Sequence, residues 1–192
     1  MAHHPSMLPL AKNARYTENG DKSSNSATHV WGPTVTLGNY KLYFADPQAG
    51  QVGFFGTIEE HGHPIILGLR LKVCFPSRKT WQTSPSSIKR SRLPSAELIR
   101  FANSYFEGME AGTDKNTPFD KDCQRIGNGV ITSNDPASES PITRMNCGAQ
   151  FATGFTKVIT RVEERRFPVV DEERRIVLAI VRYHHMERRH GA

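Results

Sequence analysis

Apolar residues recur at every second position in the first part of the chain, a spacing that is typical of half-buried β-strands. Such runs occupy residues 34–45, 51–60 and 65–73, and short turns containing Pro, Gly or His separate them. Because strands joined by short turns usually pair antiparallel, the pattern predicts a three-stranded meander. The alternation then stops in a stretch rich in Ser and Pro at 74–94, which predicts a linker.

After this linker, apolar positions return with helical spacing. We expect the helix to have Ser95 as its N-cap, after Pro94, and to end at Gly112. A short helix is predicted at 145–155, followed by strands at 156–167 and 175–183. The helical stripe consists of Leu98, Ala102, Tyr105, Phe106 and Met109.

Two segments of the chain resemble each other. Residues 8–20 reappear with changes as residues 117–129, and both segments end in Asn-Gly. Further on, Asp46 and Asp171 each precede a predicted turn and an apolar strand. Such echoes indicate two copies of one unit.

The two copies divide the chain. We expect a first, truncated repeat at 1–73, the linker at 74–94 and a second repeat at 95–192.

Charge and cysteine usage narrow the class of protein. The net charge is +6, and most of it comes from the linker, so nucleic-acid binding is unlikely to be the main role. The chain has no apolar run long enough to cross a membrane and no leader with an apolar core, which favours the cytoplasm. The three cysteines form no Cys-x-x-Cys pair and indicate free thiols in a reducing compartment.

Several short runs carry a resemblance to a known family. They include Arg-Tyr-Thr-Glu-Asn-Gly at 15–20, Gly-Gln-Val-Gly-Phe-Phe-Gly at 50–56, Asp-Cys-Gln-Arg at 122–125 and Arg-Arg-Phe-Pro-Val-Val-Asp-Glu-Glu-Arg at 165–174. The chain resembles a largely uncharacterised fungal and bacterial family, similar to the SnoaL-like branch of the nuclear transport factor 2-like superfamily. The resemblance implies an α+β fold of two cone-shaped repeats, each with a curved antiparallel sheet packed on helices, as an intramolecular pseudo-dimer or a homodimer.

The same resemblance implies a small-molecule enzyme of the dehydratase, isomerase or cyclase type that needs no cofactor or metal. Asp122 and His185 would transfer protons, since a carboxylate or an imidazole in a dry pocket can act as acid or base. Substrate-binding positions would be Arg125, Asn128, Glu18, Tyr16 and Arg166.

Each of these positions also has a purely structural interpretation. Asp122 and Arg125 could form a salt bridge that orients their segment, the Asn-Gly pairs favour tight bends, and Arg166 lies in a charged hairpin typical of a solvated turn. Adjacent strand residues point to opposite faces, so only one of His184 and His185 can enter a pocket. The alternative function is therefore a non-catalytic ligand-binding or dimerisation module of the same fold.

Overall fold

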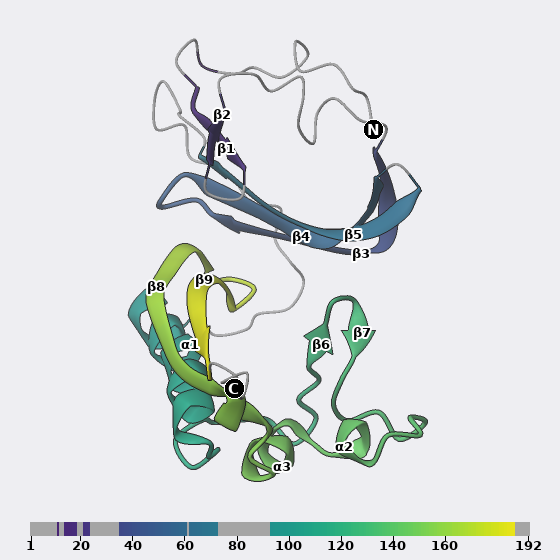
Figure 1. Ribbon diagram of the computed structural model, residues 1–192. Coiled ribbons are helices and arrows are strands. Elements are labelled where there is room, and N and C mark those ends of the chain that lie inside the picture. Colours follow the sequence, from purple (N-terminus) through teal and green to yellow (C-terminus); the bar gives the residue numbers. More distant parts are fainter. Residues whose placement is uncertain are drawn as a thin grey trace, which may run out of the picture.

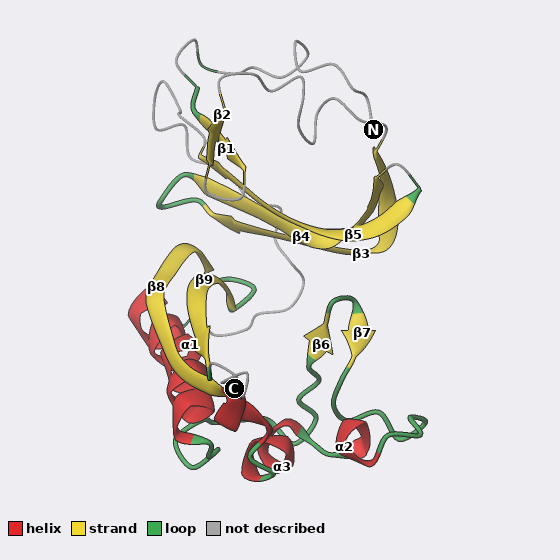
Figure 2. Ribbon diagram, viewed as in Figure 1, coloured by secondary structure: helices red, strands yellow, loops and turns green. Residues whose placement is uncertain are grey.

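The computed structural model contains helices and antiparallel sheets, which confirms the α+β class (Figures 1 and 2). None of its described helices is long and apolar enough to cross a membrane. The structure describes residues 11, 14–18, 21–23, 35–60, 62–72 and 93–186.

The predicted meander is confirmed as the first sheet. It consists of β3 (Val35–Asp46), β4 (Gln51–Glu60) and β5 (His63–Lys72), paired antiparallel in the order β3-β4-β5. A register shift between Leu37 and Lys41 marks a bulge in β3. Figure 1 shows the sheet as a curved trough.

The second sheet is a two-stranded hairpin packed on a helix. β8 (Ile159–Asp171) pairs antiparallel with β9 (Ile176–His185), and α1 (Ser95–Ala111) packs against both strands. The apolar stripe that predicted the helix supplies the core, together with aromatic rings from the segment between α1 and β8. Its buried members are Phe106, Met109, Phe151 and Val162, with Tyr105, Phe119, Phe155, Ile159, Phe167, Ala179 and Val181 packed around them.

The predicted start of α1 is wrong by one residue. Pro94 occupies the N-cap position, and Ser95 is the first helical residue. The backbone N–H and the hydroxyl of Ser95 both donate to Glu172 Oε1, at 2.8 Å and 2.6 Å. The carboxylate of Glu172, on the β8–β9 turn, thus satisfies helix-end groups that a capping side chain would otherwise serve. The predicted end is confirmed, since Gly112 adopts a left-handed conformation with φ of 63°.

Two small hairpins lie in the segments that the sequence repeats. β6 (Ile126–Gly127) and β7 (Val130–Ile131) are joined by Asn128 and Gly129, which have φ of 52° and 81°. Positive φ at both positions matches the twist of the flanking strands, and Asn-Gly tolerates it best. β1 (Tyr16–Glu18) and β2 (Asp21–Ser23) likewise pair across a two-residue gap.

Short helices follow the second hairpin: α2 (Pro141–Arg144), α3 (Cys147–Ala152) and the 3-10 helix η3 (Phe155–Val158). The short helix predicted at 145–155 is present as α3 but is shorter, and it ends before Gly154, which has a left-handed φ of 74°.

The expectation of free thiols is wrong for two of the three cysteines. Cys123 and Cys147 form a disulfide that ties the segment before β6 to the start of α3. Disulfides persist mainly in oxidising environments, so the cysteines no longer support a reducing compartment. Cys74 and most of the predicted linker at 74–94 lie outside the described residues.

The turns after β3 and β8 are held in the same way. Asp46 Oδ1 accepts a hydrogen bond from the backbone N–H of Ala49 at 2.8 Å. Asp171 Oδ1 accepts one from the backbone N–H of Arg174, also at 2.8 Å. Each aspartate therefore closes its own turn with one carboxylate oxygen.

The other oxygen of each aspartate accepts a hydrogen bond from a strand of the other sheet, since β3 lies beside β8. Asp171 Oδ2 accepts from the backbone N–H of Ala45 at 3.1 Å, and Asp46 Oδ2 accepts from that of Val170 at 3.4 Å. The two strands are thus joined by a reciprocal pair of contacts, which we call the aspartate clasp. The clasp is made by the aspartates that the sequence comparison aligned.

Candidate functional site

The hollow best suited to a ligand is a groove in the first sheet. It has a volume of about 280 Å³ and lies over all three strands. Cross-strand pairing explains its lining, because Tyr43 lies opposite Phe54 and Phe54 opposite Leu69, and directly opposed residues share a face. The groove is lined by Leu37, Tyr43, Val52, Gly53, Phe54, Leu67, Leu69 and Leu71.

The floor of this apolar groove is buried and its walls are open. Phe54 is 8% exposed, whereas Tyr43 is 53% and Leu71 45% exposed. The rings of Tyr43 and Phe54 lie with centroids 5.0 Å apart and an interplanar angle of 50°. The Tyr43 hydroxyl is the polar side-chain group among the lining residues, so the groove offers large apolar surface with one hydrogen-bonding handle.

The opposite face of the same sheet turns toward the β6–β7 and β8–β9 hairpins (Figure 1). A Cβ on Gly129, at the tip of the β6–β7 hairpin, would lie 3.3 Å from a methyl carbon of Thr57. Thr57 alternates with Gly56 and Ile58 along β4, so it points away from the groove. The hairpin tip therefore contacts one face of the sheet, and the groove-lining side chains of β4 lie on the other.

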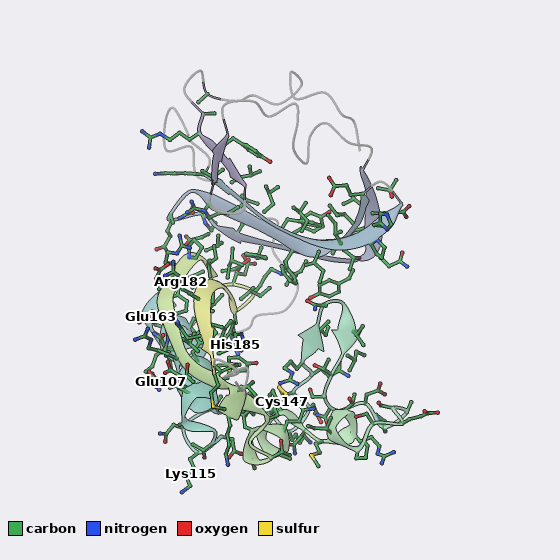
Figure 3. All side chains as sticks on the ribbon, in the orientation of Figure 1. Glu107, Lys115, Cys147, Glu163, Arg182 and His185 are labelled. Carbon is green, nitrogen blue, oxygen red and sulfur yellow. A yellow bond between two sulfur atoms is a disulfide. The ribbon has the colours of Figure 1, made fainter. Side chains whose placement is uncertain are left out.

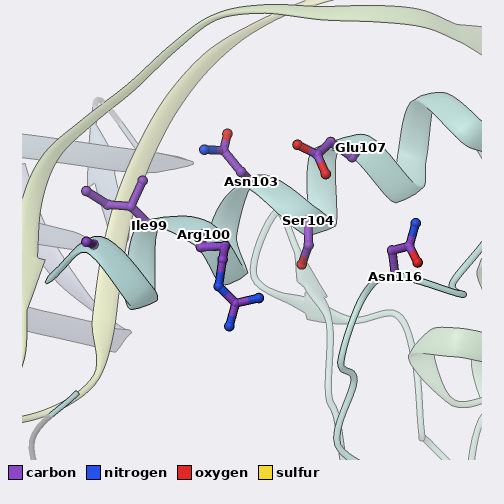
Figure 4. Close-up of a pocket in the computed structure, with 7 residues that line it drawn as sticks. Ile99, Arg100, Asn103, Ser104, Glu107 and Asn116 are labelled. Atoms are coloured by element: carbon purple, nitrogen blue, oxygen red, sulfur yellow. The ribbon is translucent and has the colours of Figure 1, made fainter. Parts of the chain in front are cut away.

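A second hollow, of about 470 Å³, lies on the outer side of α1 and opens widely to solvent (Figure 4). Its polar side chains do not converge. Ser104 and Arg100 point away from Asn103 and Glu107 in Figure 4, and the Ser104 hydroxyl donates to the carbonyl of Phe101. Ligand sites usually need several polar groups aimed at one point, so this hollow is the weaker candidate.

The predicted pair of Asp122 and Arg125 is not brought together as an ion pair among the described residues. Asp122 is exposed in a turn, where its backbone N–H donates to Asp120 Oδ1 at 3.2 Å. The Arg125 side chain donates to Thr132 Oγ1 at 3.0 Å, and its guanidinium lies 4.5 Å from the centroid of the Phe155 ring. Arg125 thus holds the base of the β6–β7 hairpin against η3.

The remaining predicted positions are scattered. Asn128 is exposed at the hairpin tip, Tyr16 is half-buried on β1, and Arg166 is exposed on β8. The side chain of Glu18 lies outside the described residues. Neither hollow described above is lined by any of the seven predicted site residues.

His184, the neighbour of the predicted proton-transfer residue His185, has a carboxylate partner. His184 Nε2 lies 2.7 Å from Glu163 Oε2, and Arg161 Nε lies 2.9 Å from Glu163 Oε1. His185 is exposed, and Figure 3 labels it and Glu163 on different sides of the β8–β9 hairpin. Alternation along the strand predicts this separation, but only the strand register identifies Glu163 as the partner.

The part of the chain that the structure describes contains no group of three or more His, Cys, Asp or Glu side chains able to hold a metal ion. Burial raises the pKa of Tyr183, whose hydroxyl lies 3.9 Å from Met109 Sδ, and the neighbouring Tyr105 raises it further. This tyrosine faces the core beneath α1 and lines neither hollow.

The model of one protein family matches residues 91–192, more than half of the chain. The family is described as Domain of unknown function (DUF8021). No curated protein and no solved structure matches the chain.

Proposed function

The chain belongs to the DUF8021 family, and we propose that it is a non-catalytic module that binds a neutral, apolar small molecule in the groove of β3–β5. The observation that carries the proposal is the groove itself, in which leucine, valine and aromatic side chains from three strands surround one volume of about 280 Å³. Contiguous exposed apolar surface on a monomer commonly marks a binding site.

The chemistry of the lining defines the ligand class. The lining residues carry no charge, so an ionised ligand would lose hydration without gaining a partner. The rings of Tyr43 and Phe54 suit a flat or ring-containing ligand, and the Tyr43 hydroxyl can donate to a carbonyl or ether oxygen. The volume fits a molecule at the small end of the drug-sized range.

A fluorescence titration with the neutral probe N-phenyl-1-naphthylamine tests the proposal. We expect saturable binding to the wild-type chain and a loss of at least about tenfold in affinity for Tyr43→Asp, because an apolar ligand would take the new carboxylate out of water without giving it a partner. Phe55→Asp is the matched control, since Phe55 is the next residue after Phe54, is 38% exposed and points to the other face. No saturable binding to a folded wild-type chain, or equal losses in both variants, would refute the groove as the site.

A second candidate is the cofactor-independent enzyme of the SnoaL-like kind, a lyase, isomerase or cyclase. The pair of His184 and Glu163 favours it, because a carboxylate can orient an imidazole for proton transfer. Support for the cone-shaped fold comes from the packing of α1 on the curved β8–β9 hairpin and from the aspartate clasp, which joins the proposed two repeats.

Deuterium uptake tests this second candidate. Ketones incubated with the protein in D₂O should gain deuterium next to the carbonyl if a base removes that proton. His184→Asn should abolish the uptake and His185→Asn should not. Uptake that stays at the buffer rate with every ketone tried, or that survives His184→Asn, removes the pair from consideration.

A further inference from the structure

Strand β9 has fewer neighbours than the strand that corresponds to it in the first sheet. Both β4 and β9 follow an aspartate-headed turn, and each spans ten residues. β4 lies between β3 and β5, whereas β9 pairs only with β8 among the described strands. The second edge of β9 therefore presents a row of backbone N–H and C=O groups for pairing.

Other strand edges in the described part of the chain carry features that discourage pairing. β5 contains Pro64, Arg70 and Lys72, and β3 is interrupted by its bulge. β8 contains Pro168 and three register shifts. Proline, charge and bulges all protect an edge from a further strand.

The first six residues of β9 lack such features. Residues 176–181 read Ile-Val-Leu-Ala-Ile-Val, with neither charge nor proline, and β-branched residues favour extended pairing. Ala179 and Val181 pack on the core, so Ile180 between them points to the outer face, where it is 39% exposed.

We propose that the free edge of β9 pairs antiparallel with β9 of a second copy of this chain, forming a two-fold symmetric dimer with a continuous four-stranded sheet. The symmetry restricts the register, because directly opposed residues must share a face and a two-fold axis places one residue opposite itself. We place Ile180 on the two-fold axis, because it lies on the outer face near the middle of the strand. It sets residues 176–184 of the two copies against one another, with Leu178 opposite Arg182.

Electrostatic repulsion favours antiparallel over parallel pairing of the two β9 strands. Arg182 lies near one end of the strand, where it forms an ion pair with Glu164 of β8 at 2.9 Å, and the β9 segment itself contains no Asp or Glu. Antiparallel pairing about Ile180 separates the two Arg182 positions by four residues along the strand, or about 14 Å. That exceeds the screening length of about 8 Å at physiological ionic strength. Parallel pairing in register would place the two guanidinium groups on neighbouring strands, about 5 Å apart.

A charge-swap experiment tests the pairing. Sedimentation of the wild-type chain over a wide concentration range should show a monomer–dimer equilibrium. Ile180→Lys and Ile180→Glu should each weaken the dimer by about tenfold or more, because like charges would face each other across the axis. An equimolar mixture of the two variants should restore dimerisation, since opposite charges then meet.

Val158→Lys is the control for an added charge, because Val158 is 54% exposed and lies outside β9. Circular dichroism establishes that each variant is folded. Amide hydrogen exchange in 176–185 should slow as the wild-type concentration rises. A wild-type chain that stays monomeric, with exchange in β9 independent of concentration, overturns the proposal. So does a dimer that both Ile180 variants leave unchanged. Neither result bears on ligand binding in the groove, which lies on the other sheet.

Discussion

The two larger sheets in the described part of the molecule, β3–β5 and β8–β9, have similar strands and different surroundings. The β8–β9 hairpin buries one face beneath α1, where Val162 is 4% and Phe106 7% exposed. The β3–β5 sheet leaves Tyr43 and Leu71 about half exposed along its groove. The comparison shows that alternation along a strand fixes which side chains share a face. Whether that face becomes core or binding surface depends on the element that covers it.

The largest expected difference between the sheets is in stability. Phe151 is 1% exposed and meets the rings of Tyr105, Phe119 and Phe155. Phe151→Ala should lower the free energy of unfolding by about 4 kcal/mol, because it removes buried apolar contacts and leaves a cavity.

Leu71→Ala in the groove should change the same quantity by less than about 1 kcal/mol, since nearly half of the side chain is already exposed. Urea unfolding monitored by circular dichroism measures both variants. If the two changes are equal, the groove is packed as tightly as the core, and the contrast between the sheets is lost.

The second prediction concerns the disulfide, which lies in the same half of the chain as α1. Replacing Cys123 and Cys147 by Ser opens a link between residues 24 apart in sequence. The loss of this restraint on the unfolded chain should lower the free energy of unfolding by about 3 kcal/mol.

Thermal unfolding with and without dithiothreitol measures this effect. The wild-type protein should lose stability in the reductant, and the double Ser variant should not respond. A Tm that is unchanged by reduction in the wild-type protein would show that the link contributes nothing. At a temperature at which both forms are folded, reduction should leave the fluorescence of the groove probe unchanged, because the cysteines lie outside the β3–β5 sheet.

The elements of the fold were largely predictable, because their signals are local. Period-two alternation located β3, β4 and β5 within about two residues at each end, and the helical stripe located α1. Contacts between residues far apart in the sequence were not predictable in the same way. Cys123 and Cys147 meet because the chain between them folds back through the β6–β7 hairpin and α2, and no periodicity describes that path.

The candidate site was less predictable than the fold for the same reason. The groove was not predicted, because a strand pattern does not reveal whether another element covers a given face of a sheet. Sequence alternation could not identify His184 as a histidine with a carboxylate partner, because the register of β8 and β9 brings Glu163 to it. The aligned Asp46 and Asp171 were noticed in the sequence, yet their reciprocal contacts depend on how β3 and β8 approach each other.

The aspartate clasp joins the two sheets and provides the third prediction. Asp171 is 6% exposed, and its two oxygens accept the N–H groups of Arg174 and Ala45. Asp171→Ala should lower the free energy of unfolding by about 2 kcal/mol, because it leaves buried donors unpaired.

Asp46→Ala should have a smaller effect, about 1 kcal/mol, since Asp46 is only half-buried. The double variant distinguishes two independent turns from a clasp that acts as a unit. Losses that simply add would indicate independent turns, whereas a smaller combined loss would indicate coupling between the sheets. Urea unfolding of the three variants measures the coupling.

The smallest expected effect concerns Tyr183, whose ring faces α1 and whose pKa is raised by burial and by Tyr105. A tyrosine with a higher pKa in the folded state than in the unfolded state holds its proton longer when folded. Its contribution to stability is therefore complete below the unfolded pKa of about 10 and is lost as the pH rises through the folded value. Because Tyr183 is 40% exposed, solvent screens much of this contribution, and the expected change in stability is small. The free energy of unfolding, measured from about pH 8 to about pH 11, should fall less steeply for Tyr183→Phe than for the wild-type chain. Identical slopes would show that the hydroxyl of Tyr183 has the same pKa in the folded and the unfolded chain.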